Sequence, residues 1–457
     1  MRSRGFSIRL PNRNAGNPPR PGRAVIRPPQ AVQLIAERLE KAGFETWCVG
    51  GAVRDALLGH PHLDWDLATA ATPDQVRKLF RRTIPVGVDF GTVGVLDHAG
   101  VMHEVTTFRR DVQTDGRHAV VEFGASLDDD LARRDFTINA IAVSPTTTEI
   151  RDPFNGQRDL EARVVRAVGV PDERMREDRL RALRGIRFAA RLGFSIEKDT
   201  WEAIVRSAPH LPRLSRERVK QEIEKTMEQA ACPSRAFALW RSSGALHALV
   251  PAVSAQHEIA FASADHIALP AGTRRREQID ARRARRILSL FLGLPADRVR
   301  AALHDLRFSN ADVRTMTKLA EHWSAVFEPM SDVLRRSETP DDATIRRWAA
   351  ATGRTQLGAF LRLAEARWAA MRGADMPAPT PERASSVYRR ALRIAYRDPI
   401  ELADLAVDGE DLMREGIARG PALGKILRLL LEWVVEEPAR NIRDQLLARA
   451  KDLARET

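Results

Sequence analysis

The spacing of apolar and polar residues divides this chain into a mixed first part and a helical second part. Between Pro29 and about residue 170, segments with helical spacing alternate with short apolar runs typical of strands. From Pro171 onward, almost every segment has the spacing of an amphipathic helix. The pattern predicts an α+β fold in which a small mixed sheet with its helices precedes an all-helical region.

The first part contains a regular series of predicted elements. In chain order these are helices over 31–43 and 52–58 and strands over 45–49, 62–68, 92–96 and 102–108. Thr72 followed by Pro73 is typical of a capped helix start. The polar, glycine-containing residues 111–130 indicate a mobile loop with one short strand over 118–123.

The stretch from the first to the second predicted strand carries the most specific chemistry. Gly50 and Gly51 end an apolar run, where paired glycines let a backbone approach an anion closely, and Arg54 can then meet the same phosphates. Asp64 and Asp66 alternate in the next strand, so both carboxylates project to one face, as suits Mg²⁺. Paired glycines alone usually mark a turn, and Asp-x-Asp alone a solvated strand. Together they predict a site for a nucleoside triphosphate with Mg²⁺.

Further polar residues accompany this stretch. Glu104 on a neighbouring strand could complete a metal site or accept the proton of an attacking hydroxyl, and it could equally face water. Arg134 could bind triphosphate, while Asp135 and Asn139 offer hydrogen bonds to ribose hydroxyls. As an isolated motif, this group also fits an ordinary helix N-terminus.

A row of charged residues opens the helical part. Asp178, Arg181, Arg184 and Arg187 follow one another in steps of three. On a straight helix each step drifts by about 60°, so the ends of the row cannot all face one small ligand. Asp178 and Arg181 could read one flat object, with the later arginines reaching phosphates. A solvated basic face is the alternative, which the apolar residues that follow disfavour.

Composition narrows the class of protein. The 457 residues are 44% hydrophobic and 29% charged, and no apolar run approaches the roughly 18 residues of a membrane span. Two cysteines form neither a disulfide framework nor a zinc pattern, which favours a reducing, cytoplasmic location. The net charge of +12, mostly from arginine, indicates a polyanionic partner. Seven arginines between Arg274 and Arg286 would usually form a solvated helix face, and here they also suit an RNA backbone.

Taken together, the motifs resemble those of the bacterial class II tRNA nucleotidyltransferase and poly(A) polymerase family. The resemblance covers nearly everything after Pro29, although residues 250–400 match only loosely. The motifs are G-G-A-V-R-D-A-L-L-G, D-W-D-L-A-T, E-V-T-T-F-R, R-R-D-F-T-I-N-A-I-A, D-P-F-N-G, E-D-R-L-R-A-L-R-G-I-R-F and the tail from Asp408 to Lys451.

This resemblance implies a polymerase-β-type nucleotidyltransferase head followed by a helical neck, body and tail. Residues 1–29, with seven arginines and no acid, are expected to form a disordered basic arm that brushes RNA or is inert. An N-terminal targeting peptide is less in keeping with its prolines. The other expected segments are the head at 30–170, the neck at 171–250, the body at 251–400 and the tRNA-contacting tail at 401–457.

The resemblance also implies roles for single residues. Asp64 and Asp66 hold Mg²⁺, and Glu104 is a candidate catalytic helper. Asp178 and Arg181 pair with the Watson–Crick edge of the incoming base, since an Asp acceptor beside an Arg donor complements cytosine and adenine but not guanine or uracil. The residues assigned to nucleotide binding are Gly50, Gly51, Arg54, Arg134, Asp135, Asp178, Arg181, Arg184 and Arg187.

The expected function is template-independent addition of C, C and A to tRNA 3′ ends from CTP and ATP with Mg²⁺. The alternatives are a poly(A) polymerase, a partial enzyme that adds only CC or only A, and a catalytically silent RNA-binding protein. The complete loop at 115–118 favours competence for the final A, because CC-only members look shortened there. The intact pair of aspartates argues against the silent protein, and no His-Asp cluster suggests a separate phosphohydrolase. The sequence does not fix the oligomeric state.

Overall fold

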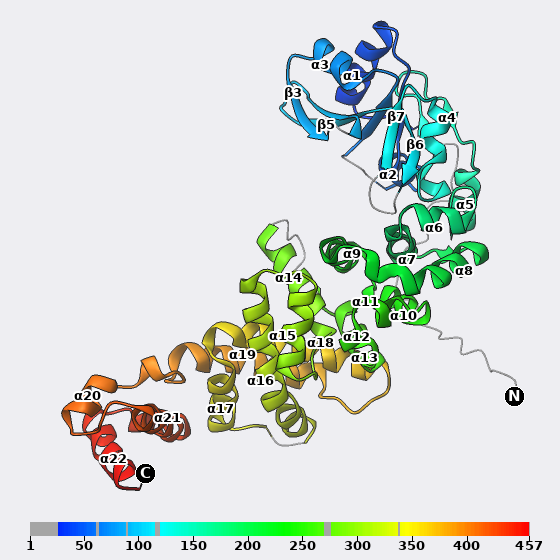
Figure 1. Ribbon diagram of the computed structural model, residues 1–457. Coiled ribbons are helices and arrows are strands. Elements are labelled where there is room, and N and C mark those ends of the chain that lie inside the picture. Colours follow the sequence, from blue (N-terminus) through cyan, green and yellow to red (C-terminus); the bar gives the residue numbers. More distant parts are fainter. Residues whose placement is uncertain are drawn as a thin grey trace, which may run out of the picture. The chain divides into compact units, whose positions relative to one another are not determined.

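The computed structural model of the chain describes residues 26–60, 64–87, 90–114, 119–268, 276–336 and 339–456. The predicted disordered arm up to residue 25 and the loop at 115–118 lie outside these ranges. The chain forms two compact units, the first ending at His210 and the second beginning at Leu211 (Figure 1). The finer division into five segments stays a prediction.

One mixed sheet forms the centre of the first unit. Its strands are β1 (Thr46–Val49), β2 (Asp66–Thr69), β3 (Thr83–Gly87), β4 (Thr92–Leu96), β5 (Met102–Thr107), β8 (Ala142–Val143) and β9 (Ile150–Arg151). They lie in the order β3-β4-β5-β2-β1-β8-β9, and neighbours are antiparallel except for β2 and β5. This sheet, together with the many helices, confirms the predicted fold class.

Helices complete the first unit. Helices α1 and α3 lie side by side next to the sheet, and α1 turns a stripe of buried apolar residues inward (Figure 1). The helices are α1 (Gln30–Lys41), α2 (Gly51–Leu57), α3 (Pro73–Leu79), α4 (Leu127–Ala132), α5 (Gly156–Ala162), α6 (Pro171–Glu177), α7 (Leu180–Leu192) and α8 (Lys198–Ser207). A small parallel pair joins β10 (Val164–Val165) to β11 (Ser195–Ile196).

The predicted start of α3 is confirmed. Thr72 is the N-cap, and its hydroxyl accepts a hydrogen bond from the backbone N–H of Gln75 at 3.4 Å. The Gln75 side chain accepts in return from the backbone N–H of Thr72 at 2.8 Å. Such a reciprocal cap satisfies two backbone donors that the first helical turn would leave unpaired.

Two predictions about the first unit are wrong. The short strand predicted over 118–123 is confirmed as β7 (Ala119–Phe123), but the rest of the expected loop at 111–130 contains most of its hairpin partner, β6 (Arg109–Thr114), and the first turn of α4. The start of α4 had a readable signal, because Ser126 caps it by accepting from the backbone N–H of Asp129 at 3.2 Å. Asp64, expected to share a strand with Asp66, lies two residues before β2 begins.

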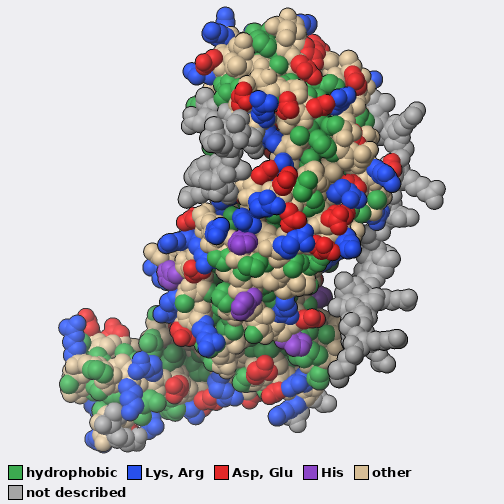
Figure 2. Space-filling model, turned by 45° about the vertical axis from the view of Figure 1, so that its right-hand side comes forward, with side chains coloured by type: hydrophobic (Ala, Val, Ile, Leu, Met, Phe, Trp, Pro, Cys, Tyr) green, Lys and Arg blue, Asp and Glu red, His purple; other side chains and the backbone are tan. Residues whose placement is uncertain are grey.

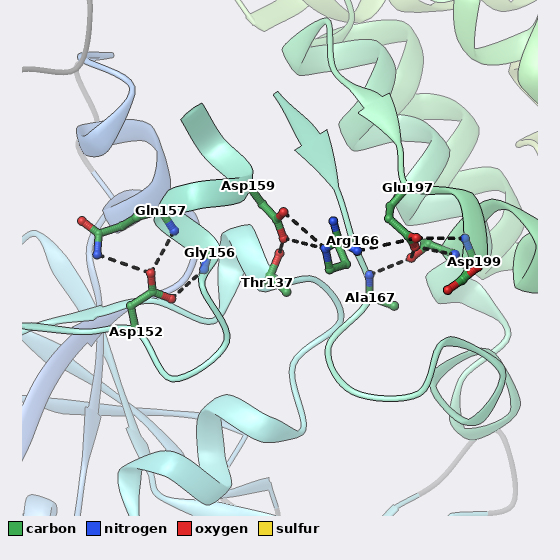
Figure 3. A network of polar contacts seen from close by, with 10 residues as sticks. Thr137, Asp152, Gly156, Gln157, Asp159, Arg166, Ala167, Glu197 and Asp199 are labelled. Carbon is green, nitrogen blue, oxygen red and sulfur yellow. Dashed lines mark hydrogen bonds and ion pairs between the residues drawn. The ribbon is translucent and has the colours of Figure 1, made fainter. Parts of the chain in front are cut away.

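The D-P-F-N-G turn belongs to a polar network that joins several elements of the first unit (Figure 3). The Asp152 carboxylate accepts from the backbone N–H of Gly156 at 2.7 Å and so holds the first turn of α5. Asp159, further along α5, accepts from the Thr137 hydroxyl at 2.7 Å and from Nε of Arg166 at 3.1 Å. Asp152 therefore holds the start of α5 and Asp159 binds Thr137 and Arg166, so both carboxylates are occupied by groups of the first unit.

The described part of the second unit consists of helices and contains no strand. Two predicted helix starts are confirmed, with Ser215 capping α9 and Gly420-Pro421 opening α21. None of the described helices is both long and apolar enough to cross a membrane. The helices are α9 (Arg216–Gln229), α10 (Pro233–Ser242), α11 (Ala245–Leu249), α12 (Pro251–Ser254), α13 (Glu258–Asp265), α14 (Arg276–Ser289), α15 (Ala296–Asp305), α16 (Asn310–Arg335), α17 (Asp342–Thr352), α18 (Arg354–Gly373), α19 (Pro381–Arg397), α20 (Gly409–Arg414), α21 (Pro421–Glu436) and α22 (Arg443–Glu456).

The arginine run on α14 does not form one solvated face, which corrects the sequence-based interpretation. Arg286 is 2% exposed and donates to the backbone carbonyls of Met227 at 2.7 Å and Ala230 at 3.0 Å. Arg283 pairs with Glu228 at 3.1 Å. These guanidinium groups satisfy carbonyl and carboxylate oxygens inside the unit, so they are not available to an RNA backbone. On the face shown in Figure 2, basic side chains likewise lie among acidic ones rather than in one patch.

We expect Gly156→Ala to destabilise the first unit strongly. A Cβ at this position would lie 2.2 Å from the backbone oxygen of Thr137 and 2.7 Å from the side chain of Ile141, so the backbone must move. Overpacking of this kind costs about 1–3 kcal/mol or more. Chemical denaturation followed by circular dichroism measures the change.

Gly424→Ala is the matched control for this variant. Gly424 lies inside α21, and a Cβ there would meet nothing within 4 Å. Replacing a helical glycine with alanine in open space stabilises by about 0.5–1 kcal/mol. Equal denaturation midpoints for Gly156→Ala and the unaltered protein would contradict the packing account.

Candidate functional site

Three carboxylates lie near one another where β2 begins. The parallel strands β2 and β5 are in register with Leu67 opposite Val105, so Asp66 and Glu104, one position earlier on each strand, are lateral neighbours on one face. Asp64 lies close enough for its charge to act on the Asp66 carboxyl. The structure therefore brings together the three carboxylates singled out in the sequence.

The charges at this point repel one another. Burial, followed by repulsion from Glu104 and Asp64, raises the pKa of Asp66 to about 6, whereas Arg134 opposes the rise. A divalent cation would relieve this repulsion, because it favours ionised carboxylates. Among the described residues, no group of three or more His, Cys, Asp or Glu side chains is arranged so that it could hold a metal ion. The site thus suits a cation that takes one or two carboxylates and completes its shell from water and phosphate.

The turn between β1 and α2 approaches these carboxylates closely. Gly50 has φ of 78°, which side-chain-bearing residues rarely adopt. A Cβ on Gly50 would lie 3.1 Å from Nη1 of Arg134 and 3.9 Å from Oδ2 of Asp66. Arg134 donates through Nη2 to Asp130 at 3.0 Å, while its buried Nε meets no acceptor in the described part of the chain. Arg134 is therefore held beside the glycine turn with hydrogen-bonding capacity to spare.

Arg54 lies in the interior, beneath the glycine turn. Its side chain is 2% exposed, with Nε donating to Asp55 at 2.8 Å and Nη1 donating to Asn139 at 2.6 Å. The other oxygen of Asp55 accepts from Nη2 of Arg191 at 2.9 Å. Burial lowers the pKa of Arg54, although Asp55 favours its charged form. In this structure Arg54 supports the turn from the inside, and a phosphate contact by Arg54 stays a prediction.

Asp135 and Asn139 continue the same chain of contacts. Asn139 donates from its amide nitrogen to Asp135 at 2.9 Å, and Asp135 accepts from Nε of Arg184 at 2.7 Å. Burial alone would raise the pKa of Asp135, but Arg184 and the Asn139 hydrogen bond hold it below its ordinary value. Both side chains are less than 9% exposed, so they connect Arg54 to α7, and their predicted contact with ribose stays a prediction.

Three arginines of the site lie around the ring of Phe188. The guanidinium carbons of Arg54, Arg184 and Arg187 lie 5.2, 5.5 and 4.5 Å from its centroid. Cation–π contacts of this length contribute about 0.5–2 kcal/mol each. The arginines of α7 thus pack partly against this buried ring, which confirms that they do not form a solvated basic face.

Asp178 and Arg181 do not share one continuous helix. Asp178 lies at the break between α6 and α7, and its carboxylate accepts from the backbone N–H of Leu180 at 3.0 Å. Arg181 is 9% exposed, with Nη1 donating to Glu177 at 2.5 Å and Nη2 to the backbone oxygen of Arg133 at 2.9 Å. Reading a base with Arg181 would require it to exchange one of these partners, and the role stays a prediction.

Sequence reasoning missed the residues that support this site. Asp55 and Arg191 complete the buried pairings of Arg54, and Asp130 anchors Arg134. The only indications for the first two were positional, since Asp55 directly follows Arg54 and Arg191 lies one helical turn beyond Arg187. The pairing across 136 residues of sequence had no local signal.

Comparisons with known proteins converge on one family. Residues 46–166 match the family described as poly A polymerase head domain, residues 193–256 the one described as probable RNA and SrmB-binding site of polymerase A, and residues 281–450 the one described as tRNA nucleotidyltransferase domain 2. The three matched regions follow one another along the chain. They agree with the motifs read from the sequence.

Whole-length relatives carry one name. The chain is 35% identical over 411 residues to the CCA-adding enzyme of Lactobacillus delbrueckii subsp. bulgaricus, a match covering 89% of this chain and 93% of that enzyme. It is also 35% identical over 428 residues to that of Geobacillus kaustophilus, covering 93% and 97%. The crystal structure of the Bacillus stearothermophilus CCA-adding enzyme in complex with CTP is similar with a TM-score of 0.71 at 31% identity, covering 94% of this chain and 99% of that one.

We expect Asp55→Ala to destabilise the protein by about 3–5 kcal/mol, because removing one partner of a buried ion pair leaves the other charge uncompensated. The carboxylate serves both Arg54 and Arg191, and the Arg54 and Asp55 side chains are 2% and 3% exposed. Glu37→Ala is the control, since its pair with Lys41 is 43% and 79% exposed and should contribute about 0–1 kcal/mol. Similar losses for both variants on urea denaturation would contradict the assignment of Asp55 to a buried network.

Proposed function

This chain belongs to the family of CCA-adding tRNA nucleotidyltransferases, and from that membership we propose how its own residues carry out the reaction. The enzyme adds C, C and A to tRNA 3′ ends from CTP and ATP without a nucleic-acid template. One observation supports the assignment of the chemistry most directly. It is the register of β2 and β5, which makes Asp66 and Glu104 neighbours beside Arg134 and the glycine turn.

A divalent cation takes part in this class of reaction, and we propose that it is Mg²⁺ held by Asp64 and Asp66. Oxygen ligands, mutual repulsion that a cation would relieve, and the need for water and phosphate to complete the shell all suit this ion. When bound, Mg²⁺ activates the attacking hydroxyl and stabilises the departing pyrophosphate.

The proposed step is an in-line nucleotidyl transfer. The 3′-hydroxyl oxygen of tRNA forms a bond to the α-phosphorus, the bond from that phosphorus to the bridging oxygen breaks, and pyrophosphate leaves. We assign the acceptance of the hydroxyl proton to Glu104, which lies on the same face as Asp66. We assign the neutralisation of triphosphate charge to Arg134, which Asp130 holds beside Gly50.

Selection of the base is assigned to Asp178 and Arg181. An acceptor and a donor side by side match cytosine, and after a small rotation adenine, whereas guanine and uracil offer donors where acceptors are needed. Arg181 would release Glu177, its present partner at 2.5 Å, to meet the base. Glu177 thereby keeps the guanidinium charge-compensated between turnovers.

The proposed compartment is the cytoplasm, where tRNA is processed. The cysteines support this proposal, since Cys48 and Cys232 are both free thiols. Cys48 is buried in β1, where desolvation, followed by the charge of Asp66, raises the pKa of its thiol well above the ordinary value. A thiol so protected is inert and needs no disulfide.

A poly(A) polymerase is the second candidate, favoured by the match of residues 46–166 to a poly A polymerase head domain. Purified protein is incubated with a tRNA lacking CCA and either labelled CTP or labelled ATP. We expect CTP to be incorporated as two residues in the absence of ATP. Long runs of A without any use of CTP would establish the second candidate instead.

We expect Asp64→Ala to abolish nucleotide incorporation, a loss of at least about a thousandfold, while tRNA affinity changes less than about twofold. The substitution removes a metal ligand and no contact that the tRNA needs. Asp74→Ala, at an exposed carboxylate in the first turn of α3, serves as the control and should keep full activity. Incorporation by Asp64→Ala at the normal rate would exclude the proposed mechanism.

A further inference from the structure

The second unit contains a cavity of about 490 Å³ that the reaction described above does not use. It lies among the end of α13, α14, α18 and α19, all within the unit that begins at Leu211. This volume is in the range of sites that hold small organic molecules. Its apolar wall includes Leu361, Trp368, Ala384 and Val387, and its polar lining includes Arg285, Arg362, Glu365 and Tyr388.

Arg285 is the group that indicates a ligand. Its neighbours on α14 have acceptors, since Arg282 and Arg286 both donate to the backbone oxygen of Ile267 at 3.2 Å. Arg285 makes no hydrogen bond or ion pair with any residue that the structure describes, and its Nε is shut off from solvent. A half-buried guanidinium without an acceptor is costly unless an anion joins it.

A second guanidinium group adds to the positive charge that an anion would have to neutralise. Arg362, on α18, lines the same cavity, and its Nε lies 3.4 Å from the hydroxyl of Tyr388. Burial, followed by repulsion from Arg362, lowers the pKa of Arg285, while Tyr388 acts in the opposite direction. Two like charges facing one cavity form a site for an anion such as phosphate, which two guanidinium groups can grip with several parallel hydrogen bonds.

Glu365 calls for a hydrogen-bond donor on the ligand, whereas the two arginines call for an acceptor. One of its oxygens accepts from Arg372 at 2.7 Å, while the buried Oε2 has no donor among the described residues. Burial raises the pKa of this carboxyl. A ligand that carries a hydrogen-bond donor, such as an amino or hydroxyl group, would satisfy it. A nucleotide combines the three features that the lining calls for, namely a phosphate, an apolar face for the wall and a hydrogen-bond donor for Glu365.

We propose that this cavity binds a nucleotide, with its phosphate on Arg285 and Arg362 and its base along the apolar wall formed by Leu361, Trp368 and Val387. The nucleotide comes either from free nucleoside monophosphate or from a single nucleotide of a bound RNA. This site is independent of the proposed catalytic residues, because all its lining residues belong to the second unit.

Photo-crosslinking of the full chain with 8-azido-AMP in EDTA tests the site, because mass spectrometry then locates the adduct. We expect adducts on peptides of α18 or α19, reduced at least tenfold in Arg285→Gln. Arg362→Gln is the second variant, since Arg362 is exposed and its loss should leave folding intact. Arg389→Gln, an exposed arginine of α19 outside the cavity lining, is the control and should label normally.

A parallel arm separates the two sources of the nucleotide. If 8-azido-AMP labels the cavity and Arg362→Gln removes the label, free nucleotide binds there. If no label appears but tRNA affinity falls at least fivefold in Arg285→Gln and Arg362→Gln and not in Arg389→Gln, the occupant is a nucleotide of the RNA. Unchanged labelling and unchanged tRNA affinity in both cavity variants overturn the proposal. CTP incorporation by the same variants reports on the catalytic site separately.

Discussion

The buried pairing of Arg54 with Asp55 is the contact on which the catalytic part of this structure depends. An arginine that is 2% exposed is tolerated only because every face of its guanidinium is occupied, by Asp55, Asn139 and the ring of Phe188. Those partners come from three separate segments of sequence. The requirement to neutralise one internal charge therefore fixes α2, the segment around Asn139 and α7 relative to one another.

This constraint explains why a glycine turn can work so close to a cluster of carboxylates. Gly50 needs its backbone conformation and the space beside Arg134, and both are lost if α2 shifts. The register of β2 and β5 holds Asp66 at a fixed spacing from Glu104, a neighbour of like charge. The sheet sets the spacing of Asp66 and Glu104, and the buried arginine network sets the position of the turn that faces them.

The parts of the fold that were predicted correctly are those with local signals. Thr72 and Ser215 each mark a helix start by a cap that reaches only three residues along the chain. The apolar stripe of α1 can likewise be recognised from that helix alone. The carboxylates were also found, because Asp64 and Asp66 are separated by one residue only and Glu104 lies on a strand that the sequence predicts. The first strand of the hairpin, β6, was missed since its residues are mostly polar and leave no apolar alternation to read, whereas the apolar run of β7 was predicted as a short strand.

The wrong prediction for the run on α14 has its physical origin in the properties of arginine. The sequence of a run such as that on α14 predicts a charged surface, because arginine side chains are usually solvated. The guanidinium group can also lie inside a helical unit where backbone carbonyls at a helix end lack donors. Arg286 donates to two such carbonyls. Arg286 and Arg285 are adjacent in sequence and identical in type, yet one is saturated by carbonyls and the other faces a cavity without an acceptor. Only the geometry of the surrounding helices distinguishes a structural arginine from one that awaits a ligand.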